Sequence, residues 1–228
     1  MEQNVSMKIN ELPSPTWNWL KVNETPIKWS NKIEPCEIAA EGDAVATETE
    51  QLSDIETGAG GEADAIFATE NTAKYQILAD NAGQDKTVRL HISGKKDAHT
   101  AGCVEIVAKE NSTLTVVMDS RVAPDATKEE DSTAEASLAV RVRMKVESGA
   151  SVRLVQVQMP QEHETLLSDI GGNLIGEGAK VEYIQLFLGK GNLYSGCRMD
   201  LNGKESNFAT EPGYLGQAQQ ILDYNMVA

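Results

Sequence analysis

The strongest constraint on the fold is an internal repeat in the second half of the chain. The segment "GASVRLVQVQM", which begins at Gly149, aligns without gaps with "GAKVEYIQLFL", which begins at Gly178. Weaker copies begin at Asn111 and Gly216, so the four starts are separated by 38, 29 and 38 residues. A unit of this length, with several short strands and no helix, is typical of one turn of a β-solenoid. An antiparallel sandwich is the alternative, because it also contains many short strands.

Each copy of the repeat contains two adjacent apolar residues, and the apolar face of the alternating pattern changes at that pair. The pairs are Val116–Val117, Leu154–Val155, Tyr183–Ile184 and Ile221–Leu222. Adjacent apolar residues within an alternating strand indicate a bulge or a corner. We therefore expect the strands to bend at these positions.

Several other segments after residue 65 also alternate apolar and polar residues. In "LAVRVRMKV" (138–146) the apolar side chains share one face, whereas Arg141, Arg143 and Lys145 share the other. This period of two predicts strands with one solvent-exposed face. Between residues 66 and 228 no apolar stripe of helical period extends over a dozen residues. This pattern argues against a doubly wound sheet with crossover helices.

The N-terminal part of the sequence has a different composition. The first 35 residues hold several prolines and all three tryptophans, Trp17, Trp19 and Trp29. We predict a short helix and an extended arm there, with at least one tryptophan packed on the solenoid. Residues 41–64 carry eight acidic and no basic residues and end in a glycine-rich stretch, which indicates a linker or a surface-hugging loop. We place the N-terminal arm, short helix and acidic linker at 1–65, and a β-helix core, truncated at its C-terminal end, at 66–228.

Charge and cysteine content limit the partners. The formal net charge is −15, with an isoelectric point near 4.6, which opposes binding to nucleic acid and anionic membranes and favours protein or cation partners. No segment approaches the ~20 apolar residues of a membrane span, and the chain starts without an apolar signal region. Three widely spaced cysteines, Cys36, Cys103 and Cys197, fit a reducing compartment. We expect a cytoplasmic protein with no nucleic-acid or membrane partner.

Five segments carry a family resemblance through their order along the chain. They are "INELPSPTWNWLKVNETPI", "IETGAGGEAD", "EGAKVEYIQLFLG", "MDLNGKES" and "YLGQAQQILDYN". This ordered set resembles the SufB/SufD family of iron–sulfur cluster assembly proteins, and most closely its SufD-type members. The resemblance implies a mainly β fold, a right-handed parallel β-helix (β-solenoid) with a small, partly helical N-terminal region. It also implies a cytosolic complex in which SufB and SufD subunits join and each binds a SufC-type ATPase.

The sequence departs from the family pattern at its C-terminal end. Family members continue with more β-helix, a segment with an "HGAT"-like histidine motif, and terminal helices that hold the ATPase. The positions associated with cluster building and metal entry lie largely in that part, so the resemblance assigns no metal ligand or cofactor-binding residue here. We expect no cofactor in this chain, an iron–sulfur cluster only at the level of the complete complex, and no ATPase binding by this segment alone.

Residues with the chemistry for catalysis or metal binding are few and scattered. The three cysteines could ligate iron or a cluster, but none is close to another in sequence, and we interpret them as structural. Glu162, His163 and Glu164 in "PQEHET" combine an imidazole with carboxylates, in what we predict to be a solvated loop. His91 and His99 are interpreted as packing or surface residues. The stretch "TGAGGEAD" lacks the Gly-Lys-Ser/Thr of a phosphate-binding loop, so no nucleotide site is predicted.

The predicted function is that of a non-enzymatic scaffold subunit in a Suf-type iron–sulfur cluster assembly complex. The expected partners are a SufC-type ABC ATPase and a SufB-type paralogous scaffold. The alternative is a carbohydrate-binding or lyase-like β-solenoid. Such proteins present convergent acids, bases and aromatic residues on one wall, whereas this chain has only 5% aromatic residues.

The last residues, "GYLGQAQQILDYNMVA", have the apolar pattern of another strand rather than of a polar tail. A solenoid that stops inside a turn exposes unpaired backbone groups along an apolar edge. We therefore expect a truncated segment that self-associates through this edge. The expected contact residues are Ile221, Leu222, Tyr224 and Met226.

Overall fold

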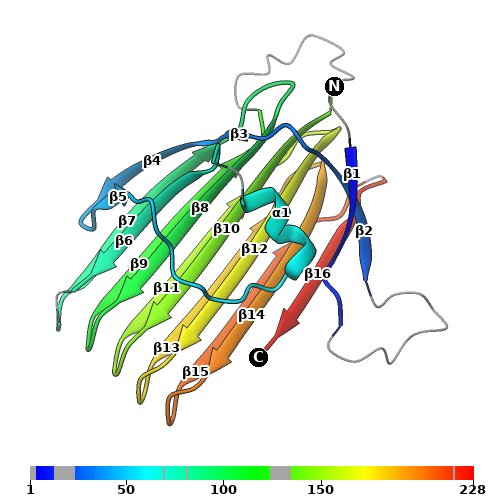
Figure 1. Cartoon of the computed structure of the whole chain (residues 1–228). Helices are drawn as coiled ribbons and strands as arrows, with labels where there is room; N and C mark the ends of the chain where they lie inside the picture. Colours follow the sequence, from blue (N-terminus) through cyan, green and yellow to red (C-terminus); the bar gives the residue numbers. More distant parts are fainter. Residues whose placement is uncertain (1–3, 13–23, 69, 81, 124–134, 218) are drawn as a thin grey trace.

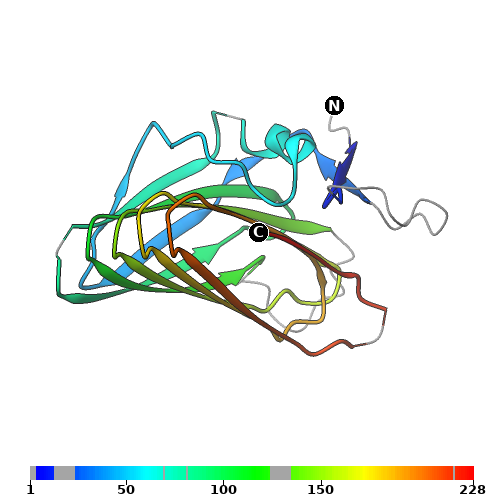
Figure 2. The ribbon, with the colours of Figure 1, turned by 90° about the horizontal axis from the view of Figure 1, so that it is seen from below.

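The chain folds as a parallel β-solenoid of about five turns. The structure is a computed structural model that describes residues 4–12, 24–68, 70–80, 82–123, 135–217 and 219–228. Two sheets lie face to face, with one small helix outside them (Figures 1 and 2). The predicted solenoid is confirmed, and the parallel pairing of successive turns excludes the antiparallel sandwich.

Sheet I has eight strands in the order β16-β14-β12-β10-β8-β6-β5, and β3 also pairs with β8. Its strands are β3 (Glu34–Pro35), β5 (Ala46–Glu48), β6 (Ala73–Ala79), β8 (His99–Ala108), β10 (Ala136–Val146), β12 (Glu164–Leu174), β14 (Asn192–Leu201) and β16 (Leu222–Val227). Sheet II has the order β15-β13-β11-β9-β7-β4. Its strands are β4 (Glu37–Gly42), β7 (Asp85–Ser93), β9 (Thr113–Arg121), β11 (Ser151–Gln158), β13 (Lys180–Phe187) and β15 (Asn207–Tyr214).

One turn conformation recurs before every strand of sheet II from β7 onward. Two residues before each strand, the backbone has a positive φ, at Gly83, Asn111, Gly149, Gly178 and Glu205. The predicted starts at 111, 149 and 178 are therefore equivalent turns. The predicted start at 216 is wrong, because the equivalent position is Glu205, and β16 belongs to sheet I beside β14. Glycine is the usual residue at positive φ. Because Glu205 occupies this position, the sequence lacks the glycine that would indicate the turn.

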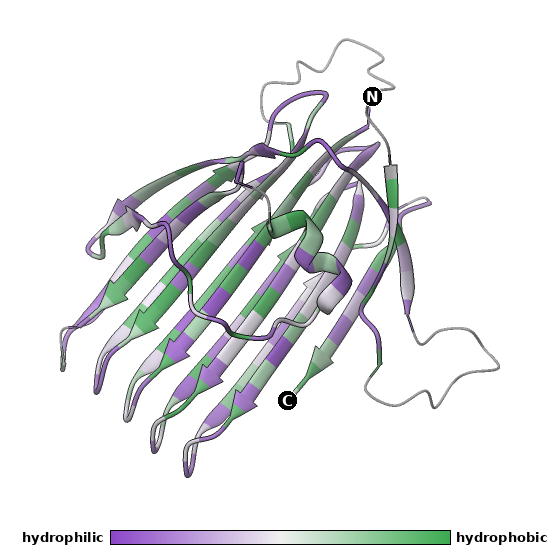
Figure 3. Cartoon of the chain, viewed as in Figure 1, coloured by the Kyte–Doolittle hydropathy of each residue, from purple (hydrophilic) through white to green (hydrophobic). Residues whose placement is uncertain are grey.

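The predicted bends at Val116–Val117, Leu154–Val155 and Tyr183–Ile184 are also wrong, whereas Ile221–Leu222 lies where β16 begins. Strands β11 and β13 pair without interruption from Ser151↔Lys180 to Gln158↔Phe187. Along β11 the alternation simply continues, so Gln156 faces the interior and Val155 faces outward. The hydrophobic and hydrophilic residues along the strands can be followed in Figure 3. The apolar face changes in the sequence because glutamines replace apolar residues inside the solenoid.

Buried glutamines form a hydrogen-bonded network between the two sheets. Gln156 Oε1 accepts hydrogen bonds from Ser168 Oγ (2.9 Å), Tyr183 Oη (2.8 Å) and Gln158 Nε2 (3.2 Å). Gln185 Nε2 donates to Gln158 Oε1 at 2.9 Å. These side chains are almost completely buried within the main apolar cluster of the solenoid. Their mutual hydrogen bonds explain how amides remain in an interior where an unpaired polar group is costly.

We expect Gln156→Leu to lower the free energy of unfolding by about 2–4 kcal/mol, because it leaves the Ser168 and Tyr183 hydroxyls buried without their acceptor. Urea denaturation measures this change. Val155→Ala is the matched control on the outward face of the same strand, with an expected loss below about 1 kcal/mol. Equal stability of the two variants would contradict the assigned role of the network.

The N-terminal residues pack on the outer face of sheet I. Strands β1 (Asn4–Ile9) and β2 (Thr25–Ser30) form an antiparallel pair. Residues 49–67, which we call the strap, run across sheet I and end in η2 (Gly61–Ala63) and α1 (Asp64–Phe67) (Figure 1). A second apolar cluster fills the space between these segments and the sheet, and Trp29 lies in it with 1% of its surface exposed.

This arrangement refines the expected N-terminal organisation. The acidic segment 41–64 overlaps most of the strap and follows the protein surface. The part of the first 35 residues that the structure describes forms strands, and residues 13–23, where the predicted short helix would have to lie, are outside the described residues. Helix α1 lies at 64–67, and β3, β4 and β5 join the two sheets before residue 65. Trp17 and Trp19 lie outside the described residues.

Candidate functional site

The outer face of sheet I carries rows of polar side chains directly beneath the strap. In one row the strand register aligns Lys74, Cys103, Arg141, Asp169 and Gly196 across β6, β8, β10, β12 and β14. The next row contains Gln76, Glu105, Arg143, Gly171 and Arg198. Parallel in-register stacking therefore brings residues far apart in sequence into direct contact.

Asp169 is the central anchor of the strap and is fully buried. Its Oδ2 accepts hydrogen bonds from Thr57 Oγ1 and Arg141 Nε, both at 2.7 Å. Its Oδ1 accepts one from the Ala59 backbone N–H at 2.9 Å. The first half of "TGAGGEAD" thus binds a carboxylate of its own chain. The only local sign of this role is an acidic residue in the apolar run "LLSDIGG", two positions before a pair of glycines.

Arg141 links the sheet to the helix. Its Nη1 donates to Asp64 Oδ1 at 2.7 Å, and its guanidinium carbon lies 4.1 Å from the centre of the Phe67 ring. Arg141 is only 3% exposed. The expected solvent-exposed face of this strand is therefore wrong at Arg141, because the strap covers it.

Glu105 and Arg143 hold the start of the strap. Glu105 accepts hydrogen bonds from the Ser53 backbone N–H (2.8 Å) and from Gln76 Nε2 (2.6 Å), and Arg143 Nη1 donates to the Ser53 carbonyl at 2.8 Å. Burial alone would raise the pKa of Glu105, but these hydrogen bonds and the Arg143 charge outweigh it and lower the pKa. The folded state therefore favours the ionised carboxylate.

A pH dependence of stability follows from this lowered pKa. Because the folded pKa of Glu105 lies below its ordinary value of 4.5, its contribution is present above that value and is lost as the pH falls through the folded pKa. We expect Glu105→Gln to flatten the decline in unfolding free energy between about pH 5 and pH 3. Urea denaturation across this range measures the slope. Glu110→Gln, at an exposed carboxylate, should retain the wild-type slope, and an unchanged slope in Glu105→Gln would contradict the assignment.

A cavity of about 300 Å³ lies between the strap and sheet I. The sheet contributes Lys74, Cys103, Arg141 and Arg143, and the strap side includes Leu52, Asp64 and Phe67. We call it the strap cavity. Its wall combines three cations with one carboxylate, in contrast to the net charge of −15 for the whole chain.

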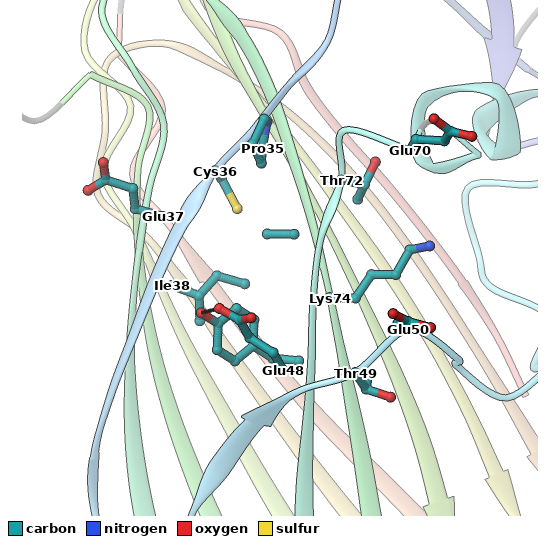
Figure 4. Close-up of a pocket in the computed structure, with 12 residues that line it drawn as sticks. Pro35, Cys36, Glu37, Ile38, Glu48, Thr49, Glu50, Glu70, Thr72 and Lys74 are labelled. Carbon is teal, nitrogen blue, oxygen red and sulfur yellow. Dashed lines mark hydrogen bonds between the residues drawn. The ribbon is translucent and has the colours of Figure 1, made fainter.

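A larger pocket of about 1110 Å³ lies between the first strands of the two sheets. Four glutamates line it, Glu37, Glu48, Glu50 and Glu70, together with Cys36 and Lys74. Figure 4 shows the Cys36 sulfur pointing into the pocket and the Lys74 amine on the side of Glu50 and Glu70. Within the described part of the chain, no group of three or more His, Cys, Asp or Glu side chains is arranged to hold a metal ion.

A comparison with known protein families matches residues 91–228, from β7 to the end of the chain, to the family described as "SUF system FeS cluster assembly, SufBD core domain". The match covers more than half of the sequence. This chain belongs to the SufBD family. The resemblance to SufB/SufD proteins is thereby confirmed, and with it an involvement in iron–sulfur cluster assembly. No curated protein and no solved structure gave a significant match.

The cysteines of this SufBD protein are all free and buried. Cys36 and Cys197 lie in the interior cluster, whereas Cys103 lies on the outer face of sheet I under the strap. Burial raises the pKa of Cys36 and Cys197 to about 12. Burial also raises the pKa of Cys103, to about 11, against the opposing charges of Arg141, Arg143 and Lys74. All three are therefore thiols at neutral pH, and thiolate is the form that binds metals.

The structure separates the other candidate residues. His91 lies on the outer face of sheet II, with Nδ1 2.6 Å from Asp119 Oδ2. His99 is the first residue of β8, and its Nδ1 lies 2.5 Å from Ser137 Oγ.

The "PQEHET" segment forms the predicted turn, in which His163 is exposed and has a positive φ of 68°. Its predicted solvation is wrong for Glu164, which is buried and accepts a hydrogen bond from the Gln161 backbone N–H at 2.6 Å. Burial raises the pKa of this carboxyl.

The predicted edge residues lie on or beside β16. Ile221 is 47% exposed, whereas Leu222, Tyr224 and Met226 are partly buried against the interior cluster. Strand β16 pairs with β14, and no other described strand pairs with its second side. Across the described residues, no helix is long and apolar enough to cross a membrane.

Proposed function

We propose that this SufBD-family protein is a non-enzymatic scaffold subunit of a Suf-type cluster assembly complex. The observation that carries the proposal is the family match, which coincides with the regular turns of the solenoid between β7 and β16. The same match favours cluster assembly over a carbohydrate-binding or lyase-like solenoid. The proposed partners are a SufC-type ATPase and a SufB-type scaffold, with this chain in the SufD-like position.

The chemistry of the described side chains supports a structural role. The buried carboxylate Asp169 and the guanidinium of Arg141 bind each other and hold the strap. The cysteines are buried, with raised pKa values, which opposes nucleophilic or cluster chemistry at neutral pH. We propose that an iron–sulfur cluster is bound only by the assembled complex, in the cytoplasm.

Co-purification tests the proposed partners. The full-length protein is expressed with a SufC-type ATPase and a SufB-type scaffold, with an affinity tag on one subunit only. We expect all three to elute together in size-exclusion chromatography, and an unrelated ABC-type ATPase serves as the control. Failure of the three proteins to form a complex would contradict the scaffold role.

We also propose that β16 pairs with the edge of a second copy of this chain. Its second side offers backbone N–H and C=O groups that no described strand uses, and such edges readily pair with another strand. Multi-angle light scattering over a range of concentrations should show a dimeric mass that Ile221→Lys reduces. A monomeric mass throughout would overturn the proposal.

A further inference from the structure

The strap cavity has the composition of an anion-binding site. Its wall carries the cations of Lys74, Arg141 and Arg143 and one carboxylate, that of Asp64. Asp64 is 61% exposed, so solvent screens its charge, whereas the Arg141 side chain is only 4% exposed. The charges of Arg141 and Arg143 are partly offset by Asp169 and Glu105, whereas the charge of Lys74 is not offset by an ion pair within the described residues. The cavity wall is therefore less acidic than the chain as a whole.

Two of the guanidinium groups have buried donors that the protein does not use. Arg141 donates hydrogen bonds from Nε to Asp169 and from Nη1 to Asp64. Its buried Nη2 has no partner among the described residues. Arg143 donates a hydrogen bond from Nη1 to the Ser53 carbonyl. Its buried Nε is likewise unpaired within the described chain. Buried donors are normally satisfied, so each unpaired N–H indicates a missing acceptor.

The third cation of the strap cavity, Lys74, lacks a counter-ion among the described residues. Lys74 lines both the strap cavity and the larger acidic pocket. It forms no ion pair with any described residue at the distances of a salt bridge, although four glutamates line the acidic pocket with it. The Lys74 ammonium lies at the end of a flexible side chain, so it can reach a ligand whose orientation is set by the two planar guanidinium groups.

From these contacts we propose that the strap cavity binds a small phosphate-like oxyanion between Arg141, Arg143 and Lys74. Guanidinium groups recognise phosphate oxygens through paired charge-assisted hydrogen bonds, and lysine adds a point charge. A volume of about 300 Å³ admits inorganic phosphate or the phosphate group of a compact ester. The ligand's oxygens would accept hydrogen bonds from the unused donors of Arg141 and Arg143, and its charge would pair with that of Lys74. This site is independent of the proposed scaffold function.

Calorimetric titration of the full chain with inorganic phosphate, at constant ionic strength set by chloride, tests the proposal. We expect saturable binding and a rise in Tm. Arg143→Gln and Lys74→Gln should each weaken binding at least tenfold. Lys145→Gln is the matched control, because this lysine faces outward on the same strand as Arg143 but does not line the cavity, and it should bind within twofold of wild type.

Further arms of the experiment distinguish the source and the class of the anion. Tighter binding of glycerol phosphate than of inorganic phosphate would assign the site to a phosphate ester, and the reverse would assign it to the free ion. Bound phosphate should also slow alkylation of Cys103, which lines the cavity, and leave Cys36 and Cys197 unchanged. Absence of saturable binding, equal affinity for acetate, or full binding by both Arg143→Gln and Lys74→Gln would overturn the proposal.

Discussion

Replacement of Asp169 by asparagine is expected to lower the free energy of unfolding by about 3–5 kcal/mol, because it leaves Arg141 buried without its principal counter-charge. Asparagine also places an amide N–H₂ where the carboxylate now accepts hydrogen bonds from both the Arg141 side and the Ala59 backbone. The remaining partner of Arg141 is Asp64, whose exposed side chain gives little compensation. Urea denaturation measures the loss.

Two further variants define what the Asp169 result means. Asp200→Asn changes a partly exposed carboxylate on the neighbouring strand, paired with Arg198 at 3.2 Å, and should cost less than about 1 kcal/mol. Arg141→Met combined with Asp169→Asn removes the unpaired charge, so the double variant should lose less than the sum of the single changes. Additive losses, or an Asp169→Asn protein as stable as Asp200→Asn, would show that the pair does not anchor the strap.

The regular part of the fold could be predicted from the sequence because its signals are local. The alternation in 138–146 predicts both the strand and its inward face, and the gapless alignment of Gly149 with Gly178 predicts two stacked turns. Both signals depend on residues that lie within one strand or one turn. Parallel stacking then follows, because equivalent positions of successive copies lie side by side.

The remaining features depend on contacts between distant segments. Nothing in the neighbourhood of Gln156 indicates that its amide faces inward, because its partners Ser168 and Tyr183 lie on other strands. The sequence pattern therefore predicts bends at the apolar pairs, although in β11 and β13 the inward-facing glutamine amides produce the change of pattern. Arg141 was expected in solvent for the same reason, since the strap residues that cover it lie more than 70 positions earlier in the sequence.

The candidate site also depends on contacts between segments that are distant in the sequence. Residues with conspicuous chemistry in the sequence, such as Cys36 and His163, lie apart in the structure. The groups that it brings together are Lys74, Arg141 and Arg143, each of which looks like an ordinary surface residue in its own segment. Their convergence arises from strand register combined with the strap, and neither is encoded within a single motif.

Replacement of Gly196 by alanine is expected to displace the strap and to lower the free energy of unfolding by about 3 kcal/mol or more. A Cβ at this position would lie 2.3 Å from the Ala59 backbone nitrogen and 2.5 Å from the Gly58 carbonyl carbon. Both neighbours are backbone atoms, which cannot rotate away as a side chain can. The strap would separate from β14, and the hydrogen bonds of Thr57 and Ala59 with Asp169 would be lost.

The three cysteines distinguish displacement of the strap from global unfolding. Cys103 lies beneath the strap, whereas Cys36 and Cys197 lie inside the solenoid, so local displacement should accelerate alkylation of Cys103 alone under native conditions. Gly61→Ala is the matched control in the strap itself, because a Cβ there meets no atom within 4 Å. That variant should keep wild-type stability and reactivity. Equal acceleration at all three thiols in Gly196→Ala would indicate global unfolding, and unchanged Cys103 reactivity would show that the close approach of the strap to β14 does not hold it in place.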